Sequence, residues 1–115
     1  MTCRITSRIV SGIVVIDLSG RLDFLEFSLR EEVQKLLGQG KREFVINMAE
    51  VPYVDSFGLG QLIMIRSSIR SEAGQMTLLQ PTDQVRKLLQ ITRLDTVFHL
   101  SEHEVVSMSD FLPMD

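Results

Sequence analysis

The residues best placed for chemistry are Asp55 and Ser56, which lie between a short apolar run at 51–54 and a segment with helical spacing. Apolar side chains of that segment recur close to the 3.6-residue helical period, at Leu59, Leu62, Ile63, Ile69 and Ala73. A short side-chain oxygen at a helix start accepts the unpaired amide hydrogens of the first turn. The pattern therefore predicts a helix beginning at residues 55–56, with either Asp55 or Ser56 as its N-cap.

Ser56 also suits a modification that adds negative charge. The helix dipole and the free amide groups at a helix start stabilise a phosphate placed there. Gly58 and Gly60 carry no side chains, so the backbone or active site of another molecule could approach the Ser56 hydroxyl closely. We therefore interpret Ser56 as a candidate kinase substrate and switch residue. Asp55 has a second candidate role beside capping, which is to position Ser56 or a metal-nucleotide held by a partner.

A catalytic role for Ser56 lacks the groups it would need. The nucleophile elbow of serine hydrolases has glycine two positions before and after the serine. Gly58 fills one of these positions, but Val54 stands at the other. A triad also needs a histidine and a third group that orients it, and the two histidines of the chain, His99 and His103, stand near its end. The sequence therefore predicts that the protein is not an enzyme.

Other site chemistries are equally incomplete. His99 and His103 have a spacing that could share a metal on one helix face, but Ser101 falls between them at an expected strand-to-helix junction. No third ligand completes a motif there, and the glycines near Ser56 form neither a dinucleotide fingerprint nor a phosphate-binding loop. We therefore expect no metal site and no cofactor. Asp23 is interpreted first as a helix cap.

Composition limits the class of protein. A chain of 115 residues predicts a single domain, 1–115, with its own core. A formal net charge of −3 without a basic block argues against a nucleic acid or an anionic membrane as partner. Cys3 is the only cysteine, so no internal disulfide can form. No signal peptide and no apolar run near the ~20 residues of a membrane span occur, which predicts a cytoplasmic protein.

The elements that would position Ser56 alternate between strand and helix. Strands are expected at 4–10, 13–18, 44–48, 76–79 and 97–100, and helices at 24–37, 56–74 and 82–91, with a last helix capped by Ser101. The order β-β-α-β-α-β-α-β-α predicts an α/β fold. In it, a mixed sheet of about five strands packs with about four helices, and the opening hairpin forms an antiparallel edge.

Three smaller expectations concern side chains. Met64 and Met76 are expected in the core, and the helix at 82–91 is expected to turn Val85, Leu88, Leu89 and Ile91 inward. Phe57 stands beside the candidate switch residue. Two alternatives are open for it: it either anchors a partner or folds into the domain.

Residues 54–60, Val-Asp-Ser-Phe-Gly-Leu-Gly, resemble the signature of the STAS domain, the family of bacterial anti-sigma factor antagonists. The usual form in that family is Asp-Ser-Ser/Thr-Gly-Leu-Gly, and a partner kinase phosphorylates the serine that matches Ser56. Phe57 departs from the pattern, because the family more often has Ser or Thr there. Residues 20–23 and 85–95, followed by Phe98, are similar to other parts of the family, so the resemblance covers almost the whole chain.

The resemblance implies a function. The protein would be an anti-sigma factor antagonist that binds an anti-sigma factor with serine kinase activity and so releases a sigma factor, while a serine phosphatase resets it. Phosphorylation would occur at Ser56, and the chain would be a monomer or weak dimer. The implied partner-binding residues are Asp23, Asp55, Ser56, Phe57, Gly58 and Leu59. The alternative is a STAS scaffold that is never phosphorylated, or a ligand-binding regulatory domain of that type.

Overall fold

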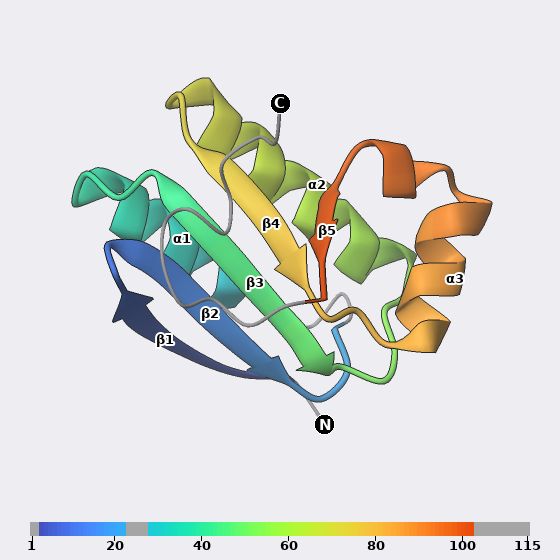
Figure 1. Cartoon of the computed structure of the whole chain (residues 1–115). Coiled ribbons are helices and arrows are strands. Elements are labelled where there is room, and N and C mark those ends of the chain that lie inside the picture. The colour runs from blue at the N-terminus through green and yellow to red at the C-terminus, as the bar shows by residue number, and fades with distance from the viewer. Residues whose placement is uncertain (1–2, 23–27, 103–115) are drawn as a thin grey trace.

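A computed structural model describes residues 3–22 and 28–102, whose five strands form one mixed sheet in the order β1-β2-β3-β4-β5 (Figure 1). β1 (Arg4–Val10) and β2 (Ile13–Ser19) pair antiparallel. β3 (Glu43–Glu50), β4 (Gln75–Leu79) and β5 (His99–Ser101) each run parallel to the preceding neighbour. The predicted α/β class and the antiparallel edge are confirmed.

The hairpin between β1 and β2 closes through a two-residue turn, as its sequence predicts. Ser11 and Gly12 have φ angles of 51° and 83°. Positive φ at both central residues is the requirement of a type I′ turn, whose twist matches that of the flanking strands. The turn pairs Val10 with Ile13 and thereby sets which residues of β2 face each side of the sheet.

Both faces of the central strands are buried, because apolar residues follow one another without the polar alternation of a half-exposed strand. One face contributes to the main core with Val14, Ile16, Leu18, Phe44, Ile46, Met48, Met76 and Leu78. The opposite face holds a smaller cluster of Ile13, Val15, Val45 and Leu79. The side chains of each strand alternate between the two clusters with a period of two.

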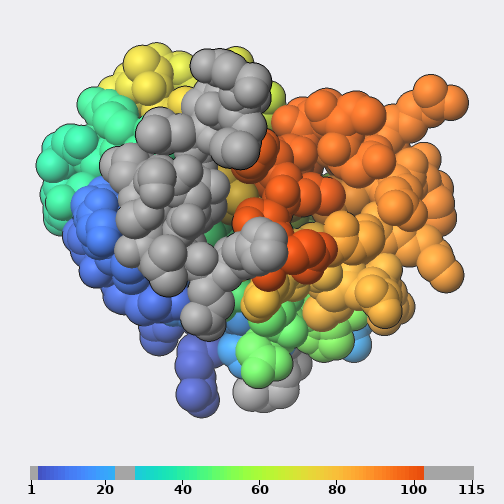
Figure 2. Space-filling model, in the orientation of Figure 1, coloured from blue at the N-terminus to red at the C-terminus, as the bar shows by residue number. Residues whose placement is uncertain are grey.

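The helices pack mainly on the larger cluster. α1 (Ser28–Gly38) and α2 (Ser56–Ser71) lie behind the sheet in Figure 1, and α3 (Asp83–Ile91) lies beside β5. A 3₁₀ helix, η1 (Leu94–Thr96), follows α3. Together, α3 and η1 form the orange right-hand side of the molecule in Figure 2. The helix start expected near residue 24 and the last helix expected beyond Ser101 fall outside the described ranges.

The buried face of α2 differs from the one expected. Leu59, Leu62 and Ile69 are buried as predicted, but Ile65 joins them and Ile63 is 42% exposed. Ile65 lies three residues after Leu62 and four before Ile69, so those three share one face. Ile63 is turned about 100° from Leu62 and faces outward.

Three further expectations are wrong for similar reasons. Ala73 follows the end of α2 with a φ angle of 62°, so it is not on the helix face at all. Ile91, the last residue of α3, is 74% exposed, since it lies about 200° around the helix from buried Leu89. Met64 is 44% exposed rather than in the core, whereas Met76 is buried as predicted.

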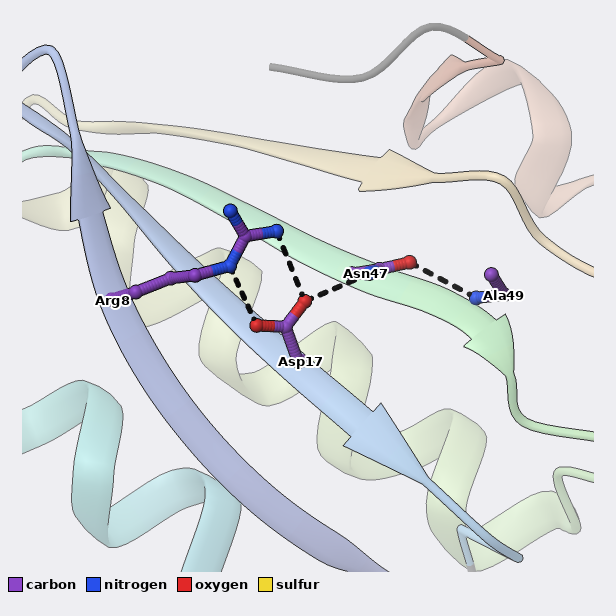
Figure 3. Close-up of polar contacts among 4 residues, drawn as sticks. All are labelled: Arg8, Asp17, Asn47 and Ala49. Atoms are coloured by element: carbon purple, nitrogen blue, oxygen red, sulfur yellow. Dashed lines mark hydrogen bonds and ion pairs between the residues drawn. The ribbon is translucent and has the colours of Figure 1, made fainter. Parts of the chain in front are cut away.

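A polar network joins the first three strands on the face of the smaller cluster (Figure 3). Arg8 donates through Nε to Asp17 Oδ2 at 2.8 Å, and Asn47 donates through Nδ2 to Asp17 Oδ1 at 2.8 Å. The Asn47 side chain in turn accepts a bond from the Ala49 amide. Burial opposes ionisation of Asp17, but the hydrogen bonds from Arg8 and Asn47 outweigh it and hold its pKa below the ordinary value.

Candidate functional site at the start of helix α2

Two loops meet at the sheet edge where β2 and β3 end. The Gly20 amide donates to Glu50 O at 2.9 Å, and the Leu22 amide donates to Tyr53 O at 3.0 Å. The Asp55 amide then donates to Leu22 O at 3.2 Å. Because the carboxyl ends of parallel strands lie at the same edge, the loops after β2 and β3 are side by side. This bonded pair of loops holds the start of α2 in place.

The start of α3 secures the same loop from the other side. Thr82 is the N-cap of α3, as predicted, and its hydroxyl accepts a bond from the Val85 amide at 3.4 Å. The same hydroxyl donates to Val51 O at 3.0 Å. Thr82 therefore links the start of α3 to the loop that leads into α2.

Asp55, not Ser56, caps α2. The Asp55 backbone is extended, with φ −92° and ψ −178°, and its Oδ1 accepts a hydrogen bond from the Gly58 amide at 2.8 Å. The Asp55 carbonyl accepts from the Leu59 amide at 2.8 Å, which closes the first helical turn. Since the cap position is taken, Ser56 is the first residue of the helix itself and needs no capping role.

The Ser56 side chain is available for chemistry. Ser56 is exposed, and its hydroxyl makes no hydrogen bond to any part of the chain that the structure describes. The first turn of α2 contains no acidic side chain. A phosphate ester on this hydroxyl would lie at the positive end of the helix dipole. Solvent exposure, a free hydroxyl and a favourable dipole are together what a phosphoacceptor serine requires.

The two glycines near Ser56 have different roles. Gly58 is buried, and a Cβ built on it would lie 2.8 Å from the carbonyl carbon of Leu22 and closer still to the oxygen. A Cβ on Gly60 would meet nothing within 4 Å. Gly58 therefore allows the loop at Leu22 to touch the helix, and the expectation that it opens access to Ser56 is wrong. The unoccupied space near Ser56 lies at Gly60.

An exposed apolar surface extends from Ser56 along α2. Phe57 is 64% exposed, so it does not fold into the domain, and Ile63 and Met64 are 42% and 44% exposed. Residues seven apart lie on the same side of a helix, which aligns Ser56 with Ile63 and Phe57 with Met64. We call Ser56, Phe57, Gly60, Ile63 and Met64 the α2 surface. Sequence reasoning missed its last two members, although α2 has more apolar residues than one buried face can hold.

A second aromatic group stands near the α2 surface. Tyr53 is 36% exposed in the loop before the helix, and the Arg21 guanidinium lies 4.6 Å from its ring centroid. A cation over an aromatic face is attracted by the ring quadrupole. The contact adds a side-chain link between the two loops that the backbone bonds already join. Neither residue was singled out from the sequence.

Several expected site residues have other outcomes. Leu59 is 8% exposed and belongs to the core, so it lies beneath the surface beside Ser56. Asp23 and His103 fall outside the described ranges, and His99 begins β5. Within residues 3–22 and 28–102, no group of three or more His, Cys, Asp or Glu side chains could hold a metal ion. In the same ranges, no helix has the length and apolar character to cross a membrane.

Sequence comparison relates the chain to regulatory proteins. A sequence profile of the STAS domain matches residues 4–106. A STAS-domain containing protein of Pseudomonas aeruginosa is 27% identical over 88 residues, which cover 76% of this chain and 87% of the relative. An anti-sigma-B factor antagonist of Staphylococcus aureus is 28% identical over 88 residues, which cover 76% of this chain and 82% of the relative.

Solved structures share the fold. An anti-sigma factor antagonist from Mycobacterium paratuberculosis aligns with a TM-score of 0.78 at 20% identity, covering 95% of this chain and 90% of the other. The Bacillus cell fate determinant SpoIIAA in its phosphorylated form aligns with a TM-score of 0.70 at 25% identity, covering 88% and 93%. SpoIIAA in its unphosphorylated form gives a TM-score of 0.69 at 23% identity, covering 89% and 90%.

Proposed function

Because this chain belongs to the STAS domain family, we propose that it is an anti-sigma factor antagonist whose partner binding is switched by phosphorylation of Ser56. The single observation that carries the proposal is the place of Ser56. It is an exposed serine at the first position of α2, its hydroxyl forms no hydrogen bond within residues 3–22 and 28–102, and it borders an exposed apolar surface. The relative from Staphylococcus aureus is named for antagonism of an anti-sigma factor, and SpoIIAA exists in both phosphorylation states.

The α2 surface would be the centre of partner binding in the unphosphorylated state. Exposed Phe57 and Met64 can insert into a groove of a partner, as aromatic and methionine side chains do at interfaces. Asp23 is proposed as a further contact at its border. Asp55, Gly58 and Leu59 would shape the surface from beneath, because Asp55 caps the helix and the other two are buried.

Phosphorylation would oppose binding without unfolding the domain. A phosphoserine adds about −1.5 to −2 charges at neutral pH. In the free protein this charge lies at the start of α2, where the dipole favours it and water solvates it. In the complex the same charge would be desolvated against apolar side chains, which is costly unless a cation pairs with it. Phosphorylation would therefore shift the equilibrium toward the dissociated partners, while the domain stays folded.

The proposed partners follow from this role. An anti-sigma factor with serine kinase activity would bind the unmodified chain and phosphorylate Ser56, and a serine phosphatase would reverse the modification. Binding would release a sigma factor. We further propose that the chain acts as one cytoplasmic, non-enzymatic domain, 1–115, and as a monomer or weak dimer.

The first test measures intact-protein mass after incubation with ATP and an extract of the source organism. Wild type should gain one phosphate, and Ser56→Ala should gain none. Ser67→Ala is the matched control, because Ser67 is an exposed serine on the same helix away from its start; this variant should be modified like wild type. An unmodified wild type, in an extract that phosphorylates a known STAS protein, would refute the switch and favour an unphosphorylated scaffold.

The second test addresses the α2 surface, using an anti-sigma factor encoded in the same genome as the probe. Phe57→Ala should weaken binding by about 2 kcal/mol, the size of an interface anchor. Ile91→Ala removes a comparably exposed apolar side chain on α3 and should leave affinity unchanged. Ser56→Asp should weaken binding while its unfolding curve stays close to that of wild type. Equal losses for Phe57→Ala and Ile91→Ala would show that the α2 surface is not the binding site.

A further inference from the structure

A cavity of about 510 Å³ lies at the opposite end of α2 from Ser56. It is open to solvent and is bordered by the last turns of α2, the start of β4, and residues just before and within β5. Its lining includes Arg66, Arg70, Met76, Thr77, Val97 and His99. β5 pairs with β4 only from Thr77 onward, so the first residues of β4 leave the sheet edge open there. The volume lies within the range of small-ligand sites in proteins.

The charged side chains in the described lining of the cavity are those of Arg66 and Arg70. Arg66 and Arg70 stand four residues apart on α2, so their side chains are neighbours on one helix face. No ion pair joins either guanidinium to a carboxylate of residues 3–22 or 28–102, and no acidic residue is among the described lining residues. Like charges at this spacing repel. Two neighbouring guanidinium groups that form no ion pair within the described residues are suited to bind an anion.

The wall of the cavity also includes a polar residue of β4, Thr77. Thr77 is 5% exposed, and its hydroxyl makes no hydrogen bond to the chain where the structure describes it. Thr77 is paired in register with His99, and both project to the face of the sheet opposite to Met76 and α2, so they border the cavity at the open sheet edge. Both side chains line the cavity.

We propose that this cavity binds a small molecule carrying at least two negative charges, such as a phosphorylated or polycarboxylate compound. The guanidinium forks of Arg66 and Arg70 match carboxylate and phosphate oxygens. Met76 and Val97 provide apolar contact for the rest of the ligand. The site is separate from the phosphoacceptor, because ten residues of α2 place Arg66 about 15 Å along the helix from Ser56.

Calorimetric titration of the full chain at low salt tests the proposal with two probes, inorganic pyrophosphate and citrate. Saturable binding of one equivalent is expected for at least one probe. Arg66→Gln and Arg70→Gln should each weaken it roughly tenfold or more, the usual loss for a charge-assisted contact. Arg30→Gln, an exposed arginine of α1 with the same change of charge, should leave the affinity unchanged.

The outcomes separate the ligand classes. If only pyrophosphate binds, the ligand is a phosphate-bearing compound, and if only citrate binds, it is a polycarboxylate. If both bind, the site recognises negative charge without distinguishing these groups. The proposal is overturned if neither probe binds saturably, or if Arg30→Gln loses as much affinity as Arg66→Gln. Because none of these readouts uses Ser56 or a protein partner, they are independent of the proposed switch.

Discussion

Replacing Gly58 by alanine tests how the loop after β2 is held against α2. A Cβ at this position would lie 2.8 Å from the carbonyl carbon of Leu22, where unstrained carbon atoms stand about 3.5–4.0 Å apart. The obstacle is backbone, so it cannot be relieved by rotating a side chain. The loop would have to move away from the helix by about an ångström, the difference between these separations.

The cost can be worked out from the contacts at Leu22. Overpacking of this kind typically costs about 1–3 kcal/mol. Displacement of Leu22 also strains its two backbone hydrogen bonds, to Tyr53 and Asp55, each contributing about 1 kcal/mol. The higher helix propensity of alanine offsets about 0.5–1 kcal/mol of this destabilisation. The free energy of unfolding of Gly58→Ala should therefore fall by about 2–4.5 kcal/mol if both bonds are lost.

Gly60→Ala is the matched control, because the same substitution two residues later meets nothing within 4 Å. It should raise the free energy of unfolding by about 0.5–1 kcal/mol through propensity alone. Urea unfolding followed by circular dichroism measures both variants at one pH. The two effects should have opposite signs. A Gly58→Ala variant as stable as Gly60→Ala would refute the close contact between α2 and Leu22.

Two further predictions concern charged side chains. Asp55→Ala should lower the free energy of unfolding by about 1 kcal/mol through loss of the cap, whereas Asp55→Asn should retain most of it; equal losses in urea unfolding would contradict the capping role. Asp17→Asn should cost at most about 1 kcal/mol at pH 7, since the pair with Arg8 is partly exposed. Because the folded-state pKa of Asp17 is lowered, its contribution is present above the ordinary Asp pKa of about 4 and is lost as pH falls through the lowered value. The difference from wild type in urea unfolding should therefore shrink below about pH 4, and a constant difference would contradict the pKa shift.

Features that depend on neighbours a few residues apart could be predicted from the sequence. The turn at Ser11 and Gly12, the cap at Thr82 and the start of α2 beside Ser56 follow from backbone preferences and the unpaired amides of a first helical turn. The alternation of strands and helices likewise predicts the mixed sheet. Turn and cap preferences depend on residues within about one helical turn of each other, so they can be applied without knowing any long-range contact.

Tertiary packing decided the rest, because it depends on which segments meet. The sequence allowed either Ile63 or Ile65 on the buried face of α2, and only packing against the sheet selected Ile65. The role of Gly58 required Leu22 to lie against it, although they are 36 positions apart (58 − 22) in the sequence. The cavity between α2, β4 and β5 likewise unites residues that no local spacing connects. Periodicity ranks faces by apolar content, but the partner segment determines which face is covered.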